Sequence, residues 1–294
     1  LTSMGYSTDP SDLNVASIAI GDLPGAQTVT RRVTNVGNSA ATYTPSVAGM
    51  VGFNVVVSPS SLTLAKGQTK SFTVTFTRTG AALNAYTGGQ LRWTDGVHTV
   101  RSPIVVRPVV FAAPTSASGS FDVKFGYTGE FTATARGLVP SVVDVGSVST
   151  GQAVDYTVTI PAGMTYARFA MFDADVSPAS DIDLEVYNAA GTLVASSGGA
   201  TSTEAANLLN PTAGTYTVRV VGFATGAGAA SFKLHTFLLG SAAAGNMLVT
   251  APASAVIGAT GTIGITTSGL TVGTRYLGSV AYAGVTGLPN PTII

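Results

Sequence analysis

The sequence contains no cysteine, only two histidines and one tryptophan, and charged side chains make up only 10% of its 294 residues. The absence of cysteine excludes disulfides, thiolate metal sites and cysteine nucleophiles together. Fourteen basic and fourteen acidic residues cancel, so no net field attracts nucleic acid or an anionic membrane surface. No apolar run approaches the roughly 20 residues that span a bilayer. We therefore expect neither a nucleic-acid partner nor a membrane span.

The two histidines do not lie in catalytic motifs. A serine-protease triad needs a serine nucleophile, a histidine base and an orienting aspartate within hydrogen-bond reach of one another. His98 follows the Asp95-Gly96 turn, His235 lies in an alternating strand pattern, and neither is near a glycine-flanked serine. We predict that both histidines are structural or surface residues and that this chain alone is not an enzyme.

Short alternating segments separated by turn residues are what the sequence has in abundance. Residues 28–38 read T-V-T-R-R-V-T-N-V-G-N, in which Val29, Arg31 and Val33 alternate with polar neighbours. This period of two predicts a strand with one buried face, and the Asn and Gly that follow favour a turn. Seven strands are predicted before residue 110, at 15–20, 27–34, 41–47, 53–58, 71–77, 89–94 and 97–106. Residues 62–64 are predicted as loop, and 108–120 as a linker. This spacing is typical of an immunoglobulin- or fibronectin-like sandwich.

Several of these segments resemble, in the same order, the fibronectin-III-like domain that follows the catalytic domain of subtilisin-like serine proteases. Gly5-Tyr6 and Asp12-Leu13-Asn14 match the hinge between the two domains in that family. The further matching segments are 29–37, 59–62, 71–77 and 91–104. The resemblance implies that residues 1–110 form such a domain. It also implies that the chain is the non-catalytic C-terminal region of a secreted bacterial protease of this family.

A second pattern occupies residues 141–239. The segments D-I-D-L-E-V-Y, G-T-L-V-A-S-S and G-T-Y-T-V-R-V begin at Asp181, Gly191 and Gly214. They resemble the pre-peptidase C-terminal domain, a jelly-roll sandwich appended to secreted bacterial peptidases. Residues 115–140 and 240–294 are predicted to pair as a split immunoglobulin-like domain around this insertion. Three domains in series remain the alternative.

Four carboxylates gather within eleven residues: Asp173, Asp175, Asp181 and Asp183. Alternate residues of a strand point to the same side, and two such pairs across a loop can direct oxygen ligands at a hard cation. Some members of the family that 141–239 resembles bind calcium. Calcium is therefore the one cofactor that the sequence suggests, and solvated loop carboxylates are the alternative.

The fold class predicted from these patterns is all-β, with a fibronectin-III/immunoglobulin-like sandwich and a jelly-roll sandwich. The resemblance implies an extracellular accessory region that stabilises a subtilisin-like catalytic domain, in the same or a cleaved chain, and holds protein substrate. The rival hypothesis is a free-standing module that binds protein or cell-surface carbohydrate. An exposed apolar patch near residues 1–20 would favour the first hypothesis, and a groove lined with Tyr and Trp far from it the second. No signal peptide opens the sequence at Leu1, so we expect any export signal upstream.

Overall fold

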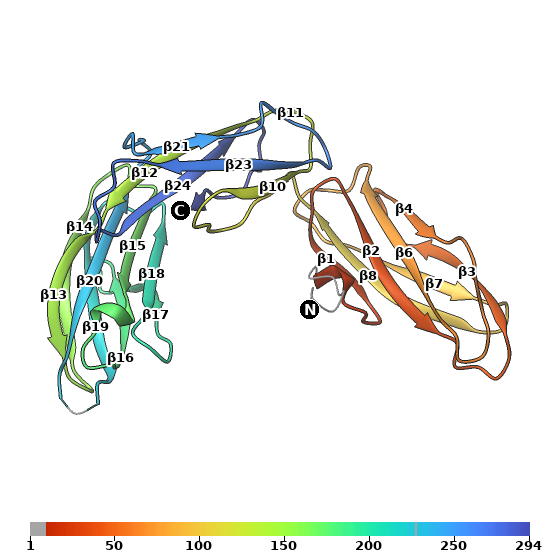
Figure 1. Cartoon of the computed structure of the whole chain (residues 1–294), viewed down its shortest axis with the longest axis horizontal. Helices are drawn as coiled ribbons and strands as arrows, with labels where there is room; N and C mark the ends of the chain where they lie inside the picture. The colour runs from red at the N-terminus through yellow and green to blue at the C-terminus, as the bar shows by residue number, and fades with distance from the viewer. Residues whose placement is uncertain (1–9, 227) are drawn as a thin grey trace.

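Strands dominate the computed structural model, which describes residues 10–226 and 228–294 (Figure 1). In these residues the helical elements are two 3₁₀ turns, η2 (Pro10–Asp12) and η3 (Asp173–Asp175). The all-β prediction is therefore confirmed. Gly5-Tyr6 of the predicted hinge lies outside the described residues. Figure 1 shows three groups of sheets that follow one another along an arch.

The first group, here called the N-terminal sandwich, is built from two facing sheets. One has the strand order β1-β8-β7-β3-β5 and the other the order β2-β6-β4. Leu23, Val29 and Phe76 are completely buried in the core between them. The strands are β1 (Ile18–Leu23), β2 (Ala26–Thr34), β3 (Ala41–Ala48), β4 (Phe53–Ser58), β5 (Leu62–Leu64), β6 (Thr69–Arg78), β7 (Thr87–Thr94) and β8 (Thr99–Pro108).

All seven strands predicted before residue 110 are present, with ends shifted by a few residues. The loop predicted at 62–64 is wrong, because this segment forms β5 against β3. Leu62 and Leu64 are each 3% exposed and pack into the core. A three-residue segment is too short for its alternation to be distinguished from a loop, so only the available strand edge decided its conformation.

The central sheets combine two stretches of chain that are far apart in sequence. Strand β10 pairs with β23, β11 with β22, and β12 with β24. The predicted linker at 108–120 is wrong in part, because Phe111 lies in β9 and is buried. The strands are β9 (Phe111–Ala112), β10 (Phe121–Phe125), β11 (Gly129–Glu130), β12 (Thr132–Pro140), β21 (Met247–Thr250), β22 (Ser254–Ala255), β23 (Thr260–Thr267), β24 (Tyr276–Ala283) and β25 (Thr292–Ile293).

The chain between β12 and β21 forms a further pair of sheets, here called the second sandwich. Their orders are β13-β20-β15-β18 and β14-β19-β16-β17. Strands β13 and β18 were not predicted. Phe237 and Leu239 of β20 pack against Leu277 of β24, which joins this sandwich to the central sheets. The strands are β13 (Val142–Val148), β14 (Ala153–Ile160), β15 (Tyr166–Met171), β16 (Asp181–Tyr187), β17 (Leu193–Ser197), β18 (Glu204–Leu209), β19 (Gly214–Ala224) and β20 (Ala230–Leu239).

This strand pairing is the one expected of the split arrangement. Its division into an immunoglobulin-like domain (115–140 and 240–294) and an inserted jelly roll (141–239) stays a prediction. Among the described residues, none forms a helix long and apolar enough to cross a bilayer.

Candidate functional sites

A buried arginine ties the segment before β1 to the N-terminal sandwich. Arg31 of β2 is only 5% exposed. Its Nη1 donates to the carbonyl oxygens of Ser11 at 2.5 Å and Thr30 at 2.8 Å, and its Nη2 donates to that of Ser17 at 3.0 Å. Burial lowers the pKa of Arg31 and the charge of Asp12 opposes this shift, but an arginine stays protonated throughout the working range. The cation therefore fixes this segment at every ordinary pH.

The same segment covers part of the free edge of β2. The Oδ1 atoms of Asp12 and Asn14 accept hydrogen bonds from the backbone N–H groups of Thr30 and Arg32, each at 2.7 Å. An edge strand normally leaves such donors open to pairing by another chain. The N–H of every second residue points the same way, so that of Thr34 is the next outward donor along this edge. In the part of the chain that the structure describes, the side-chain cover stops at Asn14.

A cavity of about 430 Å³ opens between the two sheets where β2 ends and β8 begins. Leu62, Leu64 and Trp93 lie buried in its wall. Val36 and Val100 stand at its rim, 93% and 54% exposed. The volume falls within the roughly 300–1,000 Å³ of small-ligand sites, whose walls are also mainly apolar.

Two polar side chains in the wall of this cavity limit what it accepts. The indole N–H of Trp93 is buried and has no hydrogen-bond partner among the described residues. His98 also lies in the wall, and its Nδ1 lies 3.0 Å from Oδ2 of Asp95. Hydrogen bonds from His98 and Val97 hold the pKa of Asp95 below its usual range. The cavity therefore offers mainly apolar contact and no free charge to balance a charged ligand.

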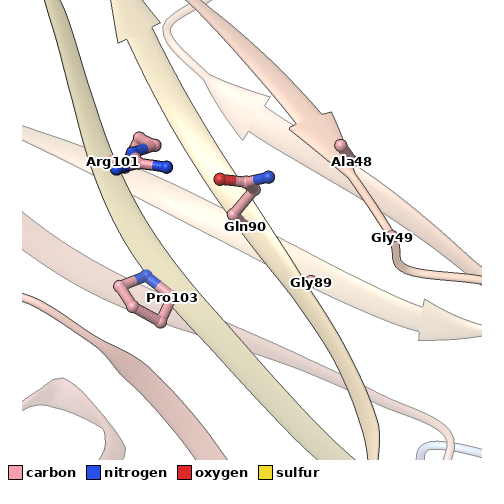
Figure 2. A pocket seen from close by; sticks show the side chains of 6 residues that line it. All are labelled: Ala48, Gly49, Gly89, Gln90, Arg101 and Pro103. Carbon is pink, nitrogen blue, oxygen red and sulfur yellow. The ribbon is translucent and has the colours of Figure 1, made fainter.

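A shallower depression of about 600 Å³ lies on the outer face of the same sandwich. Figure 2 shows the side chains of Gln90 on β7 and Arg101 and Pro103 on β8 around it, beside the nearly bare backbone at Gly49 and Gly89. A Cβ on Gly89 would come within 2.6 Å of a backbone oxygen, so the glycine there is required by strand packing. One amide and one guanidinium can bind a polar group, but they provide no acid–base pair for catalysis.

The four aspartates of the predicted calcium site are divided by the structure. Asp181 and Asp183 point to the same side of β16, and each has a buried carboxylate oxygen with no hydrogen-bond partner among the described residues. Asp173 lines a depression of about 590 Å³ together with Asp181. Burial raises the pKa of Asp183, as do the charges of Asp181 and Glu204. Among the described residues no group of three or more His, Asp or Glu side chains is placed to hold a metal ion, and calcium stays a prediction.

Asp175 instead belongs to a cluster of ionic contacts. Its Oδ2 lies 3.1 Å from Nη2 of Arg275 and 3.3 Å from Nε2 of His235, and its Oδ1 lies 3.3 Å from Nζ of Lys233. Burial would raise the pKa of Asp175, but these hydrogen bonds together hold it below its ordinary value. Arg275 comes from the turn before β24, so the cluster joins the second sandwich to the central sheets.

Sequence reasoning missed that His235 has a serine on its other side. Its Nδ1 lies 3.0 Å from Oγ of Ser141, so a serine, a histidine and Asp175 lie in a row. These residues are 60 and 94 positions from His235, and no local motif signals the contact. Burial lowers the pKa of His235, and its ring is 5% exposed between Phe172 and Phe237. A ring enclosed by protein cannot meet a substrate, and we interpret the row as a structural joint.

Apolar residues are exposed in the segment before β1. Leu13 is 66% exposed and Val15 49% exposed, although they stand between residues that are fixed to β2. The structure therefore contains both features that were expected to distinguish the protease-associated hypothesis from the binding-module hypothesis. Apolar side chains lie near the N-terminal segment, and a cavity lined with Tyr43 and Trp93 lies at another part of the sandwich.

Comparison with known proteins assigns the N-terminal third of the chain. A family model described as a fibronectin type-III domain matches residues 12–106. Subtilisin-like protease SBT3.1 of Arabidopsis thaliana is 48% identical over 98 residues, which are 33% of this chain and 13% of that protein. Subtilisin-like protease Glyma18g48580 of Glycine max is 45% identical over 100 residues, 33% of this chain and 12% of that protein. The match thus spans about an eighth of these relatives.

The solved structures add no assignment for the rest of the chain. The CupB2 chaperone of Pseudomonas aeruginosa covers 78% of this chain and 98% of its own at 10% identity, with a TM-score of 0.28. A similarity at that TM-score carries no argument. The relatives reported above are plant proteins and match only the N-terminal third, so the bacterial source and the pre-peptidase-like domain stay predictions. Residues 12–106 form a fibronectin-III-like domain similar to those of subtilisin-like proteases.

Proposed function

We propose that this chain is a non-catalytic accessory region of an extracellular subtilisin-like endopeptidase. The observation that carries the proposal is the 48% identity over 98 residues to a subtilisin-like protease, confined to the fibronectin-III-like domain. In this proposal the domain stabilises the catalytic domain and holds protein substrate for it. The second sandwich, as the predicted inserted jelly roll, and the central sheets, as the predicted split immunoglobulin-like domain, extend the same region.

The segment before β1 is the proposed contact with the catalytic domain. It is anchored through Arg31, Asp12 and Asn14, and it still presents Leu13 and Val15 to solvent. A backbone segment that is held by hydrogen bonds and exposes apolar side chains suits a preformed interface, because the segment loses little conformational entropy when it docks. The contact would bury these side chains on the face that precedes β1.

Native mass spectrometry of the protein from its natural producer tests the assignment. We expect these residues either within one polypeptide with a subtilisin-like catalytic domain or in a non-covalent complex with such a chain. Peptide sequencing identifies the catalytic domain in either case. The proposal would be refuted if the polypeptide that contains these residues has no subtilisin-like domain and is not bound to a chain that has one.

The docking surface is tested in the assembled protease. Leu13→Asp should shorten the half-life of thermal inactivation, because it places a charge in an apolar contact. Val51→Asp is the matched control, since Val51 is 81% exposed and lies elsewhere on the same sandwich. Equal half-lives for both variants would place the catalytic domain on another surface.

A further inference from the structure

We propose that the cavity between β2 and β8 is a binding site for an extended, uncharged peptide that places one apolar side chain in the cavity. The proposal names a site for the substrate-holding role proposed above and rests on that role only for the origin of the peptide. Its evidence is the juxtaposition of an apolar cavity with two strand edges that no strand in residues 10–226 and 228–294 pairs.

The first open edge belongs to β2. Side chains of Asp12 and Asn14 accept hydrogen bonds from the outward N–H groups of Thr30 and Arg32, and no other described side chain continues this cover. The N–H of Asn35 is turned inward and donates to the carbonyl oxygen of Gln68 at 3.0 Å. The alternation therefore leaves the N–H of Thr34 pointing outward, at the wall of the cavity.

The second open edge belongs to β8. Strand β1 lies parallel to β8, but its pairing begins only at Ile18 with Ile104. Residues 99–103 of β8 therefore pair with β7 on one side, and no strand among the described residues pairs with them on the other. Val100, in this free stretch, lines the cavity. Residues 99–103 of β8 and the end of β2 at Thr34 thus flank the same opening.

An extended peptide fits both features at once. Strand addition supplies main-chain hydrogen bonds at an exposed edge, and a neighbouring pocket takes alternate side chains and sets specificity. The cavity wall is mainly apolar. A charged side chain would lose its hydration without a counterion here. The site therefore selects Leu, Ile, Met or Phe and rejects Asp, Glu and Lys.

Trp93 is the only tryptophan of the chain, so its fluorescence reports on the cavity directly. The probe is a blocked heptapeptide of six threonines with a central leucine, titrated into the intact chain. We expect a saturable change in Trp93 emission. A central serine should weaken binding about tenfold or more, because burying the leucine side chain contributes roughly 1.5–3 kcal/mol.

Val36→Glu tests the rim without disturbing the core, since Val36 is 93% exposed. It should weaken the leucine peptide at least fivefold. Val51→Glu, at a comparably exposed valine outside the cavity, should leave the affinity unchanged. Both variants should keep the wild-type melting temperature. Amide hydrogen exchange at Thr34 should slow in the complex, because strand addition protects this donor.

Several results would overturn the proposal. One is the absence of any emission change with the leucine peptide at millimolar concentration. Another is equal weakening by Val36→Glu and Val51→Glu. Equal binding of a backbone N-methylated peptide or of N-acetyl-leucinamide would show a small-ligand pocket without strand addition. An emission change that follows protein concentration without peptide would show a second copy of the chain in the opening. None of these results bears on the mass-spectrometric test of the protease assignment.

Discussion

The N-terminal sandwich and the second sandwich are both pairs of facing sheets, but each stabilises a largely enclosed charged side chain in a different way. In the first, the Arg31 guanidinium is held by neutral backbone carbonyl groups. In the second, the Asp175 carboxylate is held by Arg275, Lys233 and His235. Carbonyl groups do not titrate, whereas a carboxylate and an imidazole do. The comparison teaches that the contribution of the Arg31 contacts should be insensitive to pH, whereas that of the Asp175 contacts should not.

The comparison requires that the two sandwiches unfold separately. Shortening a buried side chain in each core tests this, and it has the largest expected effect on stability. Phe76→Ala in the first and Phe232→Ala in the second should each cost about 3–5 kcal/mol, because both side chains are fully buried. In differential scanning calorimetry each variant should lower one transition only. Phe223→Ala, at a phenylalanine that is 65% exposed, should change neither transition. If both core variants lower every transition, the chain unfolds as one unit.

Removal of the buried cation has the next largest expected effect. Arg31→Met should destabilise the N-terminal sandwich by about 2 kcal/mol, because three carbonyl groups lose charged donors. Denaturant unfolding should give the same loss at pH 5 and pH 8. Arg32→Met is the control, since Arg32 is exposed and its backbone N–H keeps the contact to Asn14. A loss that changes with pH would mean that titratable groups take part.

Asp175→Asn should cost the second sandwich about 1–2 kcal/mol at pH 7, with solvent at Lys233 and Arg275 reducing the effect. The pKa of Asp175 is lowered in the folded state, so this contribution exists above the unfolded value of about 3.9 and disappears as pH falls below it. The difference from wild type should shrink accordingly in urea unfolding at pH 3. Asp173→Asn, an exposed neighbour in the same turn, is the control.

His235 adds a second pH dependence to the same sandwich. Its pKa is lowered by burial, so the unfolded chain binds this proton first as pH falls. Stability should therefore decrease below the unfolded pKa of about 6.5, until the folded histidine also becomes protonated. A flat stability profile between pH 7.5 and 5.5 would contradict the assignment of a buried, neutral ring.

The smallest change in stability is expected for Asp183→Asn, which should stabilise the protein where the other variants destabilise it. The pKa of Asp183 is raised in the folded state, so its ionised form costs stability above the unfolded value of about 3.9. Asp183→Asn should therefore stabilise the second sandwich by about 0.5–1 kcal/mol at pH 7 and by less at pH 4. Asp122→Asn in the central sheets should have no such effect.

The same variant tests the calcium prediction. Calcium bound at these carboxylates should raise the melting temperature of the wild type over that in EDTA, and Asp183→Asn should reduce the rise. Identical melting temperatures with calcium and EDTA would leave these aspartates as solvated loop and strand residues.

The sequence by itself determined the all-β class, the seven main strands before residue 110 and the fibronectin-III-like resemblance. These follow from local periodicity and turn chemistry, as in the alternation around Arg31 and the Asp95-Gly96 turn. The motif at Asp12–Asn14 was visible as well, although its role in covering the edge of β2 was not. Local patterns carry this information because each depends on neighbours in the chain.

Only the tertiary structure decided the rest. It separated Asp175 from the other three aspartates and placed His235 between residues 60 and 94 positions away. It also formed the cavity at Trp93 from five strands and the turns next to them. The physical reason is that strand pairing brings distant segments together, and a side chain's charge state and accessibility are set by the partners that it meets there.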